Sequence, residues 1–343
     1  MKAIVFHQHG DPSVLRYTDI NEPHLHPNEV LVRVHACSIN HLDLWVRRGL
    51  PGIPIPLPHI PGSDVAGEVA KIGPEVHTVH IGQKVVLAPG VTCGKCPACL
   101  SGNDNLCRDY TSLGYMVDGG CAEYVRCPEV NCMPYPENLD WVQAAAVPLV
   151  FLTAWHMLVT RAQLQPGETV LILAAGSGVG SAAIQIAKFF GAHVITTAGN
   201  DEKIEKAKQI GADEVIHHFI MPIAKEVRRL TNNRGVDVVF EHVGTATWDE
   251  SVKSLAPAGR LVTCGATTGY DAKIDLRFLF TRQLSILGSY VGTKTELRTV
   301  LKLVAQGRLM PVVDKVWPLH DCIAAHHYLE KSKQFGKIVL TIP

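Results

Sequence analysis

The chain has 343 residues, more than one ordinary domain of about 100–200 residues holds, so two domains are expected. Hydrophobic residues make up 47% and charged residues 19%, which excludes disordered and fibrous proteins. Lysine plus arginine equals aspartate plus glutamate, 32 of each, so no basic field would attract nucleic acid or anionic lipid. The chain begins in a strand-like run without a charged leader, and no apolar run has bilayer length, so a cytoplasmic protein is expected.

Short β-branched runs between Gly- and Pro-rich turns occupy roughly the first 135 residues. The runs fall at residues 29–35, 63–72, 84–87 and 121–126. Short strands bounded by turn residues predict a compact, barrel-like β domain.

From about residue 138 the pattern changes to strands that alternate with helices. Strands are expected at 168–174, 192–197, 236–240, 260–264 and 284–288, with helices at 179–190, 201–209 and 223–231. This alternation predicts a parallel, doubly wound sheet of the α/β class. The last 50 residues predict a helix at 296–306, a strand at 312–316, another helix and a strand at 337–341, which either extends this sheet or returns to the first domain.

Four of the ten cysteines lie within fifteen residues, at Cys93, Cys96, Cys99 and Cys107. A tetrahedral Zn²⁺ takes four thiolates, and a Gly- and Pro-rich loop of this length can fold around one ion. Four protein ligands leave no open position for a substrate. The spacing therefore predicts a structural zinc.

A glycine-rich turn joins the strand expected at 168–174 to the following helix. Its residues are Gly176, Ser177, Gly178, Val179 and Gly180. Small residues at such a turn let the backbone approach a pyrophosphate at the helix N-terminus. The strand–turn–helix context predicts dinucleotide binding.

The end of the next strand bears on the choice of cofactor. NAD-binding proteins place an acid there for the ribose hydroxyls, but this strand ends Thr-Thr-Ala-Gly-Asn at 196–200. We interpret Asp201 as the cap of the next helix. A neutral tip with Asn200, followed by Lys203, accepts a 2′-phosphate, so NADPH is favoured over NAD.

These motifs together resemble the medium-chain dehydrogenase/reductase superfamily, which includes zinc alcohol dehydrogenases and quinone reductases. Further matches are the Gly62 and Gly67 turns, Pro-Gly-Glu at 166–168 and Phe-Gly-Lys at 335–337. The resemblance implies a GroES-like β-barrel catalytic domain (1–137 and 290–343, zinc lobe at about 90–110) and a Rossmann domain (138–289). It also implies a small-molecule substrate, an active site between the domains, and a homodimer or homotetramer formed through residues 284–291.

The resemblance fails at the catalytic zinc of the alcohol dehydrogenases. Cys37 matches the first zinc ligand, but Ser63 stands where those enzymes have a histidine. The third position falls near 149–151, where no residue is a ligand. One match of three does not hold a zinc in the usual way.

Without that Lewis acid, hydride addition to an activated C=C is easier than addition to an isolated carbonyl. Residues 39–43 resemble the Asn-Pro-Val-Asp segment of the quinone and enoyl reductase branch, in which the Asn lies near the nicotinamide. Asn40 is thereby a candidate positioning residue, and His41, Asp43 and His59 are candidates for assisting protonation. The expected activity is NADPH-dependent reduction of a quinone, enone or enoyl compound.

Two alternatives remain open at this point. A relocated catalytic zinc on Cys37, His41, His59 or Asp64 would make the protein an alcohol dehydrogenase. A nucleotide-binding scaffold or redox sensor without turnover is the other alternative.

A few further residues have expected places. Thr153 matches a family position near the nicotinamide amide, and Gly244, Gly265 and Ala266 follow sheet strands that should line the cofactor crevice. The adjacent pair His326 and His327 is expected at the surface.

Overall fold

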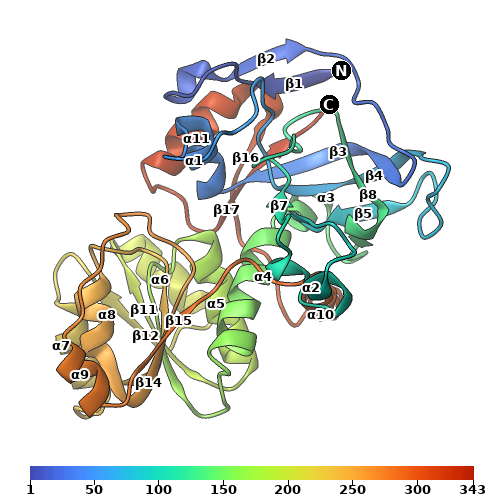
Figure 1. Cartoon of the computed structure of the whole chain (residues 1–343). Helices are drawn as coiled ribbons and strands as arrows, with labels where there is room; N and C mark the ends of the chain where they lie inside the picture. Colours follow the sequence, from blue (N-terminus) through green and yellow to red (C-terminus); the bar gives the residue numbers. More distant parts are fainter. The chain divides into compact units, whose positions relative to one another are not determined.

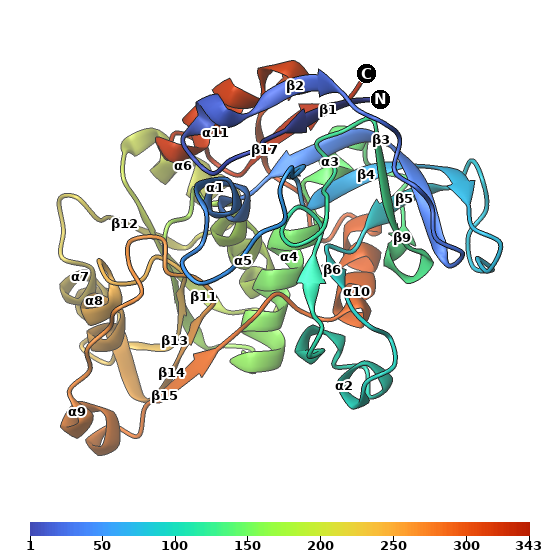
Figure 2. The same ribbon diagram turned by 45° about the horizontal axis from the view of Figure 1, so that its top comes forward.

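The structure is a computed structural model that describes residues 1–343 and divides into two compact units. Unit 1 comprises Met1–Val150 and Thr293–Pro343, and unit 2 comprises Phe151–Gly292. The two chain termini lie close together in unit 1 (Figures 1 and 2). No helix combines the length and the apolar character that a bilayer crossing requires.

Unit 1 is built around a sheet of seven strands. The order is β16-β17-β3-β4-β5-β9, with β8 paired to β3. Two further pairs, β1-β2 and β6-β7, form small sheets of their own. The strands of unit 1 are β1 (Lys2–Val5), β2 (Arg16–Asp19), β3 (Glu29–Ile39), β4 (Asp64–Ile72), β5 (Lys84–Leu87), β6 (Gly90–Val91), β7 (Thr111–Ser112), β8 (Tyr124–Pro128), β9 (Cys132–Pro134), β16 (Val313–Pro318) and β17 (Lys337–Thr341). Its α-helices are α1 (His41–Arg48), α2 (Pro97–Leu100), α3 (Trp141–Ala145), α10 (Lys294–Ala305) and α11 (Cys322–Glu330), with α4 (Pro148–Trp155) crossing the boundary. Short 3₁₀ turns are η1 (Pro12–Val14), η2 (Asp104–Leu106), η3 (Glu129–Asn131) and η5 (Leu319–Asp321).

The central strand β3 shows why this sheet forms. Val30, Val32 and Val34 alternate along it and are fully buried, as the two-residue period of a strand requires. The C-terminal strand β17 pairs antiparallel with β3, so the two ends of the chain share one sheet. β3 runs beyond the expected range of 29–35 and includes Cys37.

Unit 2 contains a sheet of six parallel strands in the order β12-β11-β10-β13-β14-β15. Its strands are β10 (Thr169–Ile172), β11 (His193–Ala198), β12 (Glu214–His217), β13 (Val236–Glu241), β14 (Leu255–Thr263) and β15 (Ser285–Gly288). Its helices are α5 (Gly178–Phe189), α6 (Asp201–Gln209), α7 (Ile223–Leu230), α8 (Trp248–Ser254) and α9 (Leu276–Thr281), with a π-helical turn, η4 (His156–Arg161). α5 lies on one side of the sheet and α7 and α8 on the other (Figure 1), as in the doubly wound fold expected from the sequence.

The first boundary between the units falls at 150/151 rather than at 137/138. The reason is α3, whose Trp141 stacks on His35 of β3 with ring centroids 4.4 Å apart. Trp141 also contacts Tyr135 at 4.7 Å. The chain therefore packs on the barrel for one more turn before it enters the parallel sheet.

Two other local expectations need correction. The strand expected at 121–126 begins only at Tyr124, because 121–123 meets β1 through a single bridge at Ala122. Helix α6 has the expected bounds, but its N-cap is Asn200, whose Oδ1 accepts from the Lys203 N–H at 2.9 Å. Asp201 is instead the first residue of the helix.

Candidate functional site

The four-cysteine lobe of unit 1 (residues 93–107) brings its sulfur atoms together. The four ligand atoms all lie within 4.8 Å of one another. The Cys93–Cys107 Sγ distance is 3.5 Å, Cys96–Cys99 is 3.6 Å and Cys93–Cys99 is 4.0 Å. A tetrahedral Zn²⁺ with Zn–S bonds of about 2.3 Å places its sulfur ligands roughly 3.8 Å apart. The four thiols fit a zinc ion.

The surroundings of two of these thiols, Cys93 and Cys96, favour the thiolate form that binds metal, whereas burial raises the pKa of Cys99 to about 11. The backbone N–H of Cys99 lowers the pKa of Cys96 to about 6. The lobe is anchored to the start of α10, beside which α2 lies in Figure 2. There the Lys294 Nζ donates to Asp104 Oδ2 at 2.8 Å and to Thr92 Oγ1 at 3.2 Å.

A second polar cluster, the Asp64 network, is buried where β3, β4 and β17 meet. Asp64 is fully buried, and its Oδ2 accepts from the Lys337 Nζ at 2.9 Å, the Asn40 Nδ2 at 2.8 Å and the Ser38 Oγ at 3.0 Å. Its Oδ1 accepts from the Leu149 N–H at 2.7 Å. Both carboxylate oxygens are therefore occupied by donors of the chain itself.

Asn40 and Lys337 hold each other in this network. The Lys337 Nζ donates to Asn40 Oδ1 at 2.5 Å and to the Ile39 carbonyl at 3.1 Å. Since both functional ends of the Asn40 amide are engaged, its orientation is fixed. Sequence reasoning missed Lys337 as a site residue, although its Phe-Gly-Lys motif had already supported the family resemblance.

The Asp43 carboxylate organises the backbone of this region. It accepts from the Asn40 N–H at 2.6 Å and from the Gly62 N–H at 2.8 Å. Burial raises the pKa of Asp43 to about 6. Because both of its oxygens serve backbone groups, the structure gives Asp43 a positioning contact rather than a place at a reacting atom.

The residues considered for a relocated zinc do not form a metal site. Cys37 is fully buried, and its sulfur faces Cys121 Sγ at 3.8 Å. His59 is 1% exposed and packs edge-on against Phe6 with ring centroids 5.4 Å apart. Asp64 is already neutralised by Lys337. Only the four-cysteine lobe brings at least three ligand atoms within metal-binding range of one another. The reaction proposed below therefore uses no second zinc.

His41 differs from the other predicted catalytic residues in its exposure. Asn40, Asp43 and His59 are 7%, 0% and 1% exposed, whereas His41 is only half-buried at the first position of α1. Its ring lies beside Trp45, one turn further along the helix, with centroids 6.4 Å apart. Among the candidates for proton delivery, His41 is therefore the most exposed.

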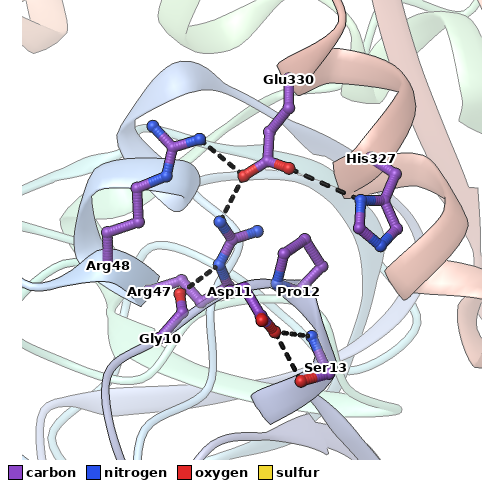
Figure 3. Close-up of a pocket in the computed structure, with 8 residues that line it drawn as sticks. All are labelled: Gly10, Asp11, Pro12, Ser13, Arg47, Arg48, His327 and Glu330. Carbon is purple, nitrogen blue, oxygen red and sulfur yellow. Dashed lines mark hydrogen bonds and ion pairs between the residues drawn. The ribbon is translucent and has the colours of Figure 1, made fainter.

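The other end of α1 borders an open surface pocket of about 500 Å³ (Figure 3). The pocket is lined by Gly10, Asp11, Pro12, Ser13, Arg47, Arg48, His327 and Glu330. The Glu330 carboxylate of α11 accepts from Arg47 at 2.5 Å and from Arg48 at 2.6 Å, both on α1. The ion pairs that line the pocket therefore connect α1 to α11.

The histidine pair on α11 corrects the expectation that both residues lie at the surface. His326 is fully buried, and its Nδ1 lies 3.1 Å from the Arg47 Nη1, while His327 is half-exposed beside Glu330. Adjacent residues on a helix point in different directions, so one histidine of the pair faces the core.

In unit 2 the glycine-rich turn forms the start of α5. Ser177 is the N-cap: its Oγ accepts from the Gly180 N–H at 2.9 Å and donates to the Ala174 carbonyl at 2.9 Å. A Cβ at Gly180 would lie 2.4 Å from the Ala174 oxygen, so only glycine fits there. The tight turn at Gly176 and the N–H groups at the start of the helix, those of Gly178 and Val179, suit a pyrophosphate.

The tip of β11 has no acidic side chain. Gly199 follows the strand, and the Asn200 side chain is used as the helix cap. Lys203 lies in the first turn of α6, and its charge together with burial and His217 lowers the pKa of His218, with burial as the main cause. The end of the strand is therefore neutral, and the first turn of α6 that follows carries Asp201 and Glu202 as well as Lys203.

Gly244, Gly265 and Ala266 come together beyond β13 and β14. A Cβ at Gly244 would lie 3.0 Å from Ala266 Cα, and one at Gly265 would lie 2.9 Å from the His242 carbonyl. The buried Glu241 carboxylate, which sequence reasoning missed, accepts from the Gly244 N–H at 3.0 Å and fixes this loop. Thr153 lies separately on α4 and is partly buried.

Known protein families match both units of the chain. Residues 26–137 match the alcohol dehydrogenase GroES-like domain, and residues 178–306 match the zinc-binding dehydrogenase family. An NAD-dependent alcohol dehydrogenase of Sulfolobus acidocaldarius is 33% identical, with both chains fully covered. A quinone oxidoreductase of Rattus norvegicus is 29% identical over the whole of this chain and 98% of its own.

The solved structures give the same answer. A crystal structure of an NAD-dependent alcohol dehydrogenase superposes with a TM-score of 0.97 at 46% identity, and each chain is fully covered. The chain combines a GroES-like domain that carries a four-cysteine lobe with a Rossmann domain, and its relatives match it along the whole length. These findings together identify its family. The chain belongs to the medium-chain dehydrogenase/reductase superfamily and is an NAD(P)-dependent oxidoreductase.

Proposed function

We propose that this enzyme uses NADPH to transfer hydride to an activated C=C bond or a quinone, and that it carries one structural zinc. The observation that supports the proposal most directly is the state of Asp64. Its carboxylate is paired with the buried Lys337 ammonium and saturated with donors. The neighbouring Cys37 sulfur packs against Cys121. These residues suit a site that stabilises an enolate by hydrogen bonds and protonates it, without a metal.

The chain's own residues can be given distinct roles in this reaction. Bound NADPH supplies the hydride, and its pyrophosphate is held by the turn at 176–180. The electron pair of the reduced C=C moves to the carbonyl oxygen, and the enolate then takes a proton. We assign proton delivery to His41, directly or through water, because it is the accessible titratable candidate. Asn40, fixed by Asp64 and Lys337, positions the reactants.

The preference for NADPH rests on the tip of β11. The strand itself ends without an acid and Asn200 is used as a cap, so the usual acceptor of the two ribose hydroxyls is missing there, while Lys203, in the same first turn of α6 as Asp201 and Glu202, supplies a positive charge for a 2′-phosphate. The names of two relatives point to NAD instead. We therefore expect Kd values at least tenfold lower for NADPH than for NADH, measured by fluorescence titration. Equal or tighter binding of NADH would contradict the preference.

A zinc-dependent alcohol dehydrogenase is the second candidate, favoured by those same names at 33% and 46% identity. Zinc per chain distinguishes the two. About one zinc after dialysis against a weak chelator fits the proposal, because only the four-cysteine lobe is then filled. About two zinc ions, with alcohol oxidation lost to a stronger chelator, would establish the alternative.

Activity is tested with His41→Gln against quinones, enones and alcohols. We expect kcat for quinone or enone reduction to fall by about 10²-fold while the KM for NADPH is unchanged, since a proton donor acts after the cofactor is bound. The exposed His7→Gln is the matched control and should retain full activity. Full activity of His41→Gln would remove the residue from the mechanism.

We further propose that two copies associate through β15, the edge strand of the unit 2 sheet. Ile286 on this strand is 38% exposed, and Tyr290 just beyond it is 52% exposed. An open strand edge with apolar side chains is a ready surface for pairing. Light scattering should give a mass of at least twice 37.4 kDa, and a monomer would contradict this.

A further inference from the structure

The segment between β10 and α5 turns at Ala174, whose backbone conformation is unfavourable for a residue other than glycine. Ala174 has φ of 51°, in the left-handed region that residues other than glycine rarely adopt. The residue lies directly before the turn at 176–180. Such a conformation persists only when the surrounding structure holds it.

Side chains from three neighbouring segments hold Ala174. On its N-terminal side, the Ala174 N–H donates to Thr197 Oγ1 at 2.9 Å. On its C-terminal side, the Ala174 carbonyl accepts from the Ser177 Oγ at 2.9 Å. The preceding carbonyl, that of Leu173, lies 2.9 Å from the Nε2 of His242.

His242 is the member of this set that sequence reasoning did not identify. It follows β13, the strand beside β10, and is 9% exposed. Because a carbonyl only accepts, Nε2 must carry the hydrogen, and the same N–H points near Ser177 Oγ at 3.4 Å. Burial lowers the pKa of His242 and so favours the neutral ring, which has one N–H to give.

The position of Ala174 decides the shape of the turn. Its carbonyl accepts both the Ser177 N–H and the Ser177 hydroxyl, and Ser177 in turn caps α5 through Gly180. A rotation of the peptide between Leu173 and Ala174 would therefore shift the cap and the first N–H groups of the helix. Those groups are the ones that face an anion at a helix N-terminus.

We propose that His242 is a positioning residue for the dinucleotide: its Nε2–H fixes the Leu173 carbonyl, and so the left-handed Ala174 on which the pyrophosphate-binding turn depends. The inference rests on dinucleotide binding, which is part of the proposed function, but not on the substrate or on the choice between NADPH and NADH. It predicts that the need for His242 disappears when residue 174 is glycine, which adopts a positive φ freely.

The test uses the purified full chain and measures Kd by fluorescence titration with NADPH and NADH. His242→Phe keeps the ring but loses the N–H, and His242→Gln restores an N–H. We expect Kd to rise roughly five- to tenfold in His242→Phe, the effect of one hydrogen bond, and to stay within about twofold of wild type in His242→Gln. The double variant His242→Phe/Ala174→Gly should recover most of the affinity.

Two further measurements separate this role from plain packing. Adenosine, which is common to NADPH and NADH and lacks the pyrophosphate, should bind all variants equally. The KM for the cofactor should rise in His242→Phe while kcat at saturation is retained. A wild-type Kd in His242→Phe, or a loss that Ala174→Gly does not restore, would overturn the role of His242. A wild-type chain that binds neither dinucleotide would overturn the proposed function as well.

Discussion

The four-cysteine lobe and the Asp64 network both concentrate negative charge, but they neutralise it with different cations. The lobe takes its four thiols from residues 93–107, and their sulfur atoms, all within 4.8 Å of one another, suit a zinc ion. The Asp64 network takes its groups from residues 38, 40, 64 and 337, and its cation is the Lys337 ammonium. One site depends on a metal from solution, and the other carries its charge within the chain.

The difference lies in how each site is assembled. The lobe is a local structure in which Cys107 is buried and the other three cysteines are partly exposed, and its four thiols come from one loop. The network is buried and depends on the pairing of β17 with β3, which places the last residues of the chain beside Asn40. We therefore expect the lobe to respond to metal removal and the network to respond to mutations that disturb the sheet.

The largest effect is expected from Cys107→Ser in the lobe. Loss of one thiolate of four should reduce zinc from about one per chain to nearly none, because a structural site binds through all four ligands. Elemental analysis of purified protein measures this. Cys121→Ala, a cysteine change in the barrel core, is the control and should leave zinc unchanged. If it also removed the zinc, the two cysteine groups would not be independent.

The next effect is expected from Lys337→Met, which leaves the Asp64 carboxylate buried without its cation. Breaking a buried pair on one side costs about 3–5 kcal/mol of the free energy of unfolding, measured by urea denaturation. Zinc content should stay at the wild-type level. Lys2→Met, which breaks the exposed pair with Asp19, should have little effect. A similarly small loss in Lys337→Met would show that water reaches Asp64.

The smallest effect is a difference in pH dependence. Since Asp43 has a pKa of about 6 when folded and 3.8 ordinarily, the folded state keeps a proton that the unfolded chain has released. Its contribution to the free energy of unfolding therefore rises as pH falls from about 6 to 4, by at most about 3 kcal/mol. The lobe behaves in the opposite way, because acid protonates its thiolates and releases zinc.

Urea denaturation of wild type and Asp43→Asn between pH 4 and 7, with zinc release followed in parallel, measures both trends. The free energy of unfolding of wild type minus that of Asp43→Asn should rise as the pH falls. A constant difference would show that Asp43 does not titrate in this range.

Much of the fold was predictable because its signals are local. Helix α6 and strand β17 have the expected bounds, and the turn at 176–180 forms a helix N-terminus as its small residues indicated. The errors occur where tertiary contacts decide. Trp141 stacks on His35, so the chain still packs against the barrel of unit 1 beyond residue 137. The local sequence contains no pattern that predicts this contact.

The sequence by itself determined the four-cysteine lobe, the pyrophosphate turn and the two kinds of sheet, since each depends on spacing over a few residues. Only the tertiary structure decided the fate of the titratable side chains. His59 and Cys37 are buried, Asp64 forms an ion pair with Lys337, and the His242 ring contacts the Leu173 carbonyl. The physical reason is that the chemistry of a side chain depends on burial and on its partners, and here Lys337 is 273 positions from Asp64 and Leu173 is 69 positions from His242.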